Sequence, residues 1–261
     1  MPGEVSDPRV MPAAAAGFSA GAEDYERGRP SYPADAVELL CRELGIGAGA
    51  RVIDLAAGTG KLTRLLVATG ADVVAVEPVA EMRERLVAQV PGVLVVNGTA
   101  ERLEASDASV DAVTVAQAFH WFDAPVALAE IARVLRPGGG LGLVWNERDG
   151  REPWVAELSR LIRWDERGRW RVPYTVEVDW AARIEALGLP FGAVSRYDTT
   201  YRQPMDVETL VARVLSTSYI AAQPVDARAE LADQVRALVA GFDAPFDLPY
   251  QTVVYWCRRE P

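Results

Sequence analysis

Over its first half the chain alternates short, wholly apolar segments with amphipathic ones. The apolar runs predict strands at 51–55, 72–76, 93–96, 110–115 and 141–145. Between them apolar residues recur every three or four positions, which predicts helices at 37–44, 62–66, 80–90 and 124–135. Apolar strands separated by helices indicate a parallel sheet covered on both faces. We therefore expect an α/β fold of the Rossmann-like, doubly wound type.

The pattern changes after residue 150. Helices are expected at 154–162 and 180–187, and alternating strands at 193–201 and 252–256. The chain between these last two strands, about 203–249, has a mostly helical pattern. We interpret it as a helical insertion that forms a lid over the open end of the sheet.

Length and composition limit the number of domains and the kinds of ligand. The 261 residues suit one domain over 23–261 after a mobile leader, 1–22. A net charge of −10, with no basic block, argues against a nucleic-acid partner. One histidine and two cysteines cannot build a common zinc site, so no metal is expected. The chain has no signal peptide pattern and no apolar run of membrane-spanning length, so we expect a cytoplasmic protein without a membrane partner. The sequence leaves the oligomeric state open.

The first strand ends in a glycine-rich turn that three chemistries could use. A P-loop fails because Leu55 replaces its first glycine and Leu62 its hydroxyl residue. A dinucleotide fingerprint is weakened because Thr63 replaces its third glycine. The third possibility combines Asp54 at the strand end with Glu77 at the end of the second strand. A carboxylate at that second position can accept hydrogen bonds from both hydroxyls of a ribose, as in NAD or an adenosine ligand.

Five motifs together carry a family resemblance; they are Asp54–Gly60, Glu77, Gly98–Glu101, Ala116–Phe122 and Leu135–Gly139. In this order and spacing they resemble the class I S-adenosylmethionine-dependent methyltransferases, and more narrowly their type 11, trans-aconitate methyltransferase-like group. The likeness is dense over about 24–147. It implies a seven-stranded, mostly parallel sheet whose last strand is antiparallel, with a cofactor-binding core at 23–147 and an acceptor-side half at 148–261.

The resemblance also implies a cofactor site. By position, Asp54 would lie near the methionyl amine, with Gly58 and Gly60 in the close-approach turn and Ala56 where the family usually has glycine. Arg29 would fold over the cofactor and pair with its carboxylate. The other residues that the resemblance assigns to S-adenosylmethionine are Tyr25, Glu77, Pro78, Met82, Ala100, Glu101 and Gln117.

His120, the single histidine, follows the fourth strand, where cofactor and acceptor should meet. It is a hypothetical general base or acceptor contact, because histidine titrates near neutrality, although a histidine among aromatic residues is often a packing residue. The residues expected to line an apolar, aromatic acceptor pocket are Phe119, His120, Trp121, Trp145, Ser218 and Tyr219.

The resulting hypothesis is transfer of a methyl group from S-adenosylmethionine to an oxygen, nitrogen or carbon of a small, apolar or aromatic acceptor, leaving S-adenosylhomocysteine. A first alternative is a protein that binds the cofactor without methylating, as a sensor or in a rearrangement assisted by the sulfonium. A second, disfavoured by Thr63, is a nicotinamide-dependent oxidoreductase.

Overall fold

The computed structural model describes residues 28–166 and 178–261. In these ranges seven strands form a sheet in the order β3-β2-β1-β4-β5-β7-β6, and only β7 runs antiparallel to its neighbours. The strands are β1 Arg51–Leu55, β2 Asp72–Val76, β3 Leu94–Val96, β4 Val110–Ala116, β5 Leu135–Arg148, β6 Ser195–Met205 and β7 Phe246–Arg258. The predicted fold class is confirmed. The strand order reverses between β1 and β4, so a ligand crevice is expected at their carboxyl ends.

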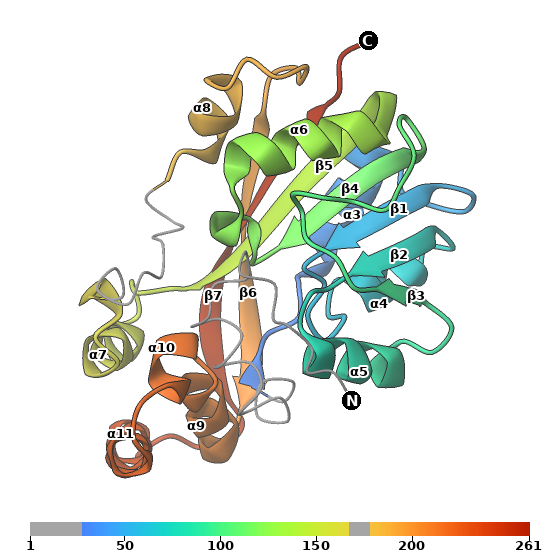
Figure 1. The fold of residues 1–261 in the computed structure, drawn as a ribbon. Coiled ribbons are helices and arrows are strands. Elements are labelled where there is room, and N and C mark those ends of the chain that lie inside the picture. The colour runs from blue at the N-terminus through green and yellow to red at the C-terminus, as the bar shows by residue number, and fades with distance from the viewer. Residues whose placement is uncertain (1–27, 167–177) are drawn as a thin grey trace.

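Helices cover both faces of the sheet (Figure 1). On one face lie α3 (Ala34–Leu44), α4 (Thr63–Val67) and α5 (Ala80–Gln89), and on the other α6 (Ala124–Val134) and α8 (Trp180–Glu185). Successive side chains of a strand point to opposite faces of the sheet, so each strand contributes to the hydrophobic core on either face. Val52 packs in the cluster with α3, whereas its neighbour Ile53 packs in the cluster with α6. No helix of the described ranges is long and apolar enough to cross a membrane.

Strand β5 begins earlier than the expected 141–145. The glycines after Pro137 belong to the strand, with Gly138 at φ +80° and a shift of register against β4. Gly140 and Gly142 face α3: a Cβ on either would lie 2.5 and 2.6 Å from side-chain carbons of Leu44 and Leu40. The glycines are therefore needed for close packing of helix on strand.

The insertion between β6 and β7 contains α9 (Val207–Leu215), α10 (Ser218–Ala221) and α11 (Val225–Leu238). These helices lie beyond the ends of β6 and β7, near α7 (Pro153–Leu161) (Figure 1). With α7 they form a separate hydrophobic cluster around buried residues such as Leu210, Leu231 and Tyr250. The insertion is shorter than the expected 203–249, because β6 and β7 remain paired as far as Met205 and Phe246.

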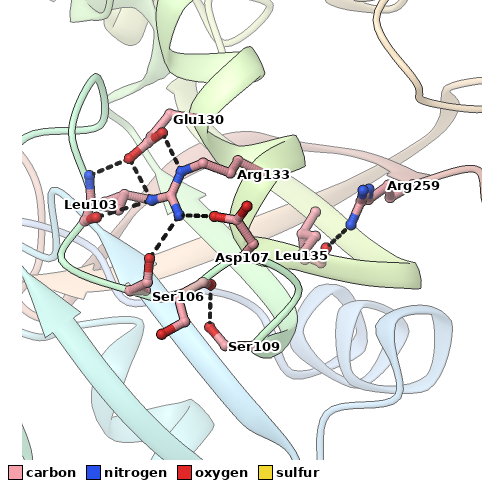
Figure 2. Close-up of polar contacts among 9 residues, drawn as sticks. Leu103, Ser106, Asp107, Ser109, Glu130, Arg133, Leu135 and Arg259 are labelled. Carbon is pink, nitrogen blue, oxygen red and sulfur yellow. Dashed lines mark hydrogen bonds and ion pairs between the residues drawn. The ribbon is translucent and has the colours of Figure 1, made fainter.

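A polar cluster fixes the loop between β3 and β4 (Figure 2). Arg133 of α6 donates to the backbone oxygens of Leu103 and Ala105 and to the carboxylates of Asp107 and Glu130. Glu130 in turn accepts from the Leu103 amide at 2.7 Å. Hydrogen bonding to Arg133 lowers the pKa of Glu130. One arginine thus ties the loop to α6.

Candidate cofactor and acceptor site

A pocket lies beside the turn that follows β1, at the carboxyl ends of β1 and β4. It is lined by Arg29, Pro30, Tyr32, Ala56, Ala57, Gly58, Thr59, Lys61, Leu62, Ala116 and Gln117. Three segments supply these residues: the segment before α3, the glycine-rich turn and the end of β4. The pocket is therefore at the expected point of strand-order reversal.

The turn between β1 and α4 has three residues in the left-handed region. Ala56, Gly58 and Gly60 have φ of +51°, +58° and +86°. A Cβ on Gly58 would meet no atom within 4 Å, so its backbone is open to a ligand. A Cβ on Gly60 would lie 3.0 Å from carbons of Leu86 and Val90 of α5. The first glycine leaves room for a ligand, and the second permits helix packing.

Asp54 lies beneath this turn and does not line the pocket. Only 1% of its surface is exposed. Its two carboxylate oxygens accept from the hydroxyls of Thr63 at 2.6 Å and Thr114 at 2.9 Å. Burial raises the pKa of Asp54 to about 6, although both hydroxyls stabilise the anion. In this arrangement Asp54 joins β1 to β4 and α4 and positions the turn from below; the expected contact with a methionyl amine stays a prediction.

Glu77 follows β2 and reaches across to the turn. Its Oε2 accepts from the Gly58 amide at 2.8 Å and its Oε1 from the Val79 amide at 2.9 Å. Burial raises the pKa of Glu77 to about 7, against these two hydrogen bonds and the nearby positive charge of Arg83. Each carboxylate oxygen has two lone pairs, so Glu77 can still accept from a diol.

Residues 28–32, which we call the strap, cross between the insertion and the sheet. Gln203 of β6 donates to the Gly28 oxygen at 3.3 Å, and Arg29 donates to the Ser216 oxygen at 3.3 Å. Asn146 at the end of β5 donates to the Ser31 oxygen at 2.8 Å. Gly28 packs so closely on Arg213 that a Cβ would lie 2.6 Å from the Arg213 backbone. Hydrogen bonds with β6, with β5 and with the insertion therefore hold the strap beside the pocket.

Gln117 directly follows β4 and has a strained backbone, at φ +59°. Its side-chain amide donates to the backbone oxygen of Asn146 at 2.9 Å, and the residue lines the pocket. Buried Asn146 also accepts from Thr252 of β7 at 2.6 Å. A non-glycine residue in this region costs about 1–3 kcal/mol, and such strain gathers at functional sites.

His120 lies in the short 3₁₀ helix η1 (Phe119–Trp121) after β4. Its Nδ1 accepts from the Trp145 indole N–H at 3.3 Å, and its ring is 5.0 Å from that of Trp121. Trp145 stacks on Trp180 at 5.4 Å and is buried. A neutral histidine whose Nδ1 accepts carries its proton on Nε2, so the ring offers a donor there.

Other predicted acceptor residues have structural contacts. Phe119 is 1% exposed and packs edge-on against Trp180, so the structure places it in the core. Tyr219 is buried and its hydroxyl donates to the Ile162 oxygen at 2.8 Å. Trp121 is partly buried and packs against both the hydrophobic cluster around α6 and that of the insertion. Tyr25 and the side chain of Ser218 lie outside the described part of the chain.

Four other residues that the resemblance assigns to the cofactor are not among those that line the pocket. Met82 is buried on α5 and Ala100 is buried after β3. Glu101 accepts from the backbone amide of Asp123, the residue before α6, at 3.1 Å. Pro78 accepts from Arg83 through its backbone oxygen at 2.8 Å. These assignments stay predictions.

Comparisons with known proteins decide the family. A model described as a methyltransferase domain matches residues 53–143. An uncharacterized methyltransferase of Mycobacterium tuberculosis is 44% identical over 241 residues, covering 90% of this chain and 93% of that protein. This chain belongs to the class I S-adenosylmethionine-dependent methyltransferases.

Solved structures agree with this fold. A proposed methyltransferase of antibiotic biosynthesis from Anabaena variabilis superposes with a TM-score of 0.62 at 21% identity, over 87% of this chain and 98% of that one. Phosphoethanolamine N-methyltransferase 2 of Haemonchus contortus, in complex with S-adenosyl-L-methionine, gives 0.56 at 15% identity, over 95% of this chain and 57% of that one. The cofactor of this methyltransferase is S-adenosylmethionine.

The site residues present fit that cofactor. The open backbone at Gly58 and the carboxylate of Glu77 suit a ribose, and the cations Arg29 and Lys61, which line the pocket, suit a carboxylate. Lys61 and Asn146 were not predicted as site residues: Lys61 lines the pocket, and Asn146 holds both the strap and Gln117. Nothing in the local sequence marks these residues, because strands and helices distant along the chain bring them to the site.

Proposed function

We propose that this methyltransferase acts on a small-molecule acceptor by direct displacement at the cofactor's methyl carbon. The observation that carries the proposal is the strap, which the insertion and the sheet hold beside the pocket through Gln203, Ser216 and Asn146. The strap thus borders the pocket beside the end of β4, where the acceptor would meet the cofactor. This bordered pocket, together with the net charge of −10, favours a small molecule over a nucleic acid.

Bound S-adenosylmethionine supplies an electrophilic methyl group on a sulfonium. In the proposal Glu77 accepts from the ribose hydroxyls while the Gly58 amide holds the carboxylate in place. Arg29 and Lys61, which line the pocket, hold the methionyl carboxylate. Gln117, fixed by its bond to Asn146, borders the reacting centre. Because displacement needs little covalent help from the protein, alignment of the two reactants is the main catalytic contribution.

Transfer of labelled methyl groups tests the class of acceptor. The purified protein is incubated with S-adenosylmethionine labelled in the methyl group and with separate small-molecule, protein and nucleic-acid fractions of a bacterial extract. Label is expected in the small-molecule fraction, with equal formation of S-adenosylhomocysteine. Label confined to protein or nucleic acid would overturn the small-molecule assignment. Cofactor binding without label transfer would instead favour a non-methylating role.

Paired variants test the cofactor site separately. Glu77→Ala should weaken binding of S-adenosylhomocysteine at least tenfold in calorimetry, because a two-point contact and the support of the Gly58 amide are both lost. Glu81→Ala, at an exposed position in the first turn of α5, is the matched control and should bind as the wild type does. Equal affinities for the two variants would remove Glu77 from the site.

A further inference from the structure

Two arginines have buried guanidinium nitrogens where the insertion meets the sheet. Arg148 is the last residue of β5, and Arg213 lies on α9 with only 6% of its surface exposed. Buried guanidinium groups require hydrogen-bond partners and a compensating charge, because burial of an unpaired ion is costly.

One tyrosine connects the two arginines. Arg148 is the cross-strand neighbour of Tyr250 in the β5–β7 ladder. The Tyr250 hydroxyl accepts from Arg213 Nε at 3.3 Å, and Tyr250 itself is fully buried. The Arg148 guanidinium carbon lies 4.5 Å from the centre of the Trp164 ring. Burial lowers the pKa of Arg148 to about 10, and repulsion from Arg213 contributes next, so the two charges are close in space.

Several donors in this cluster lack partners. Nε and Nη2 of Arg148 and Nη1 of Arg213 are buried and hydrogen-bond to no residue that the structure describes. The hydroxyl of Thr217, in the segment that follows α9, is also buried without a partner among the described residues. No carboxylate of the described chain forms an ion pair with either arginine. Exposed arginines behave differently: Arg236 of α11 pairs with Glu208 and Asp233.

We propose that Arg148 and Arg213 form an anion-binding site that holds a carboxylate or phosphate group of the acceptor. This inference rests on the proposed function and names its substrate class. A planar oxyanion can accept from both guanidinium groups at once and would satisfy the donors left open. The position is suitable, because Arg213 packs against Gly28 of the strap, whose next residue, Arg29, lines the cofactor pocket.

The site changes the expected chemistry of the acceptor. Aromatic residues alone suggested an apolar or aromatic molecule. The ring of Trp164 lies against Arg148 and is partly buried beside the hydrophobic cluster of the insertion. An acceptor with an apolar body and one oxyanion therefore fits this cluster better than a neutral molecule does.

Thermal unfolding and calorimetry with S-adenosylhomocysteine-saturated protein test the proposal. The probes are benzoate and phenyl phosphate, with methyl benzoate as the neutral counterpart and chloride at equal ionic strength as the salt control. At least one of the two anions should bind and raise the melting temperature, while methyl benzoate and chloride should not. The stronger of the two identifies the oxyanion. Absence of binding by both anions would overturn the inference.

Variants tie the effect to the two arginines. Arg148→Met and Arg213→Met should lose anion binding at least tenfold, yet the free proteins should melt at or above the wild-type temperature, because an uncompensated buried charge has gone. Arg213→Lys keeps the charge without the planar fork and should weaken binding less than Arg213→Met does. Arg236→Met is the control at an exposed position and should bind anions as the wild type does.

These outcomes separate the two proposals. If the wild-type protein does not bind S-adenosylhomocysteine, the proposed function is refuted, and this inference with it. Cofactor binding and methyl transfer without anion binding would refute only the inference. Unchanged anion affinity in a folded Arg148→Met or Arg213→Met protein would place the anion elsewhere. If both methionine variants fail to fold, Arg213→Lys supplies the same comparison.

Discussion

The indole N–H of Trp145 donates to Nδ1 of His120 at 3.3 Å, and this contact ties the single histidine to a buried tryptophan of β5. We predict that His120→Phe destabilises the protein by about 1–3 kcal/mol, because a buried donor loses its acceptor. His120→Asn can keep an acceptor near the indole and should cost less. Urea unfolding of the wild type and both variants, fitted with one common dependence of the unfolding free energy on urea concentration, measures both changes in stability. Equal destabilisation would mean that the hydrogen bond contributes nothing and that ring packing alone stabilises this position.

Glu77 should make cofactor binding depend on pH. Burial raises its pKa to about 7, and a carboxylate that accepts from ribose hydroxyls must be ionised. We expect affinity for S-adenosylhomocysteine to fall as the pH drops below about 7, and binding to release a proton. Calorimetry in two buffers of different ionisation enthalpy measures the number of protons released on binding. The same pH dependence in Glu77→Gln would assign the titration to another group.

Asp54 should make stability depend on pH in a lower range. Its pKa is raised from 3.8 to about 6 in the folded state, so the folded chain holds a proton that the unfolded chain releases. The free energy of unfolding should therefore fall as pH rises from about 4 to 6, by up to ~1.4 kcal/mol per pH unit from this group. Asp54→Asn lacks the titration, so its stability relative to the wild type should increase across that range. Denaturant unfolding at several pH values measures the difference, and a constant difference would contradict the prediction.

Ala56 occupies a left-handed conformation at φ +51°, which an L-residue adopts at a cost of about 1–2 kcal/mol. We predict that Ala56→Gly stabilises the protein by about 0.5–1 kcal/mol, since relief of strain exceeds the entropy that glycine adds to the unfolded chain. Ala57→Gly is the control: Ala57 is not in that region, so the substitution should destabilise. Thermal unfolding of both variants measures the two changes in stability. If Ala56→Gly destabilises the protein as much as Ala57→Gly does, Ala56 is unstrained.

Much of the fold could be predicted because each element has a local cause. The apolar run at 51–55 and the run at 72–76 became β1 and β2 with the same bounds. The helix ending before Gly45 also ends there in the structure, with that glycine at φ +70°. The start of β5 was missed because proline and glycines usually mark a turn, whereas here contact with α3 requires small residues.

The candidate site was predictable where residues adjoin in sequence and hidden where they do not. Sequence by itself determined the order of strands and helices, the turn that carries Gly58, and the acid at Glu77, because hydrophobic periodicity and glycine conformations act locally. Only the tertiary structure decided that Asp54 lies beneath the turn, that His120 accepts from Trp145, and that Arg148 and Arg213 meet at Tyr250. Each of these contacts joins separate elements of the fold, and Arg148 and Arg213 come together where β5, β7 and the insertion converge. The cost of burying unpaired charge therefore arises only when the chain is folded.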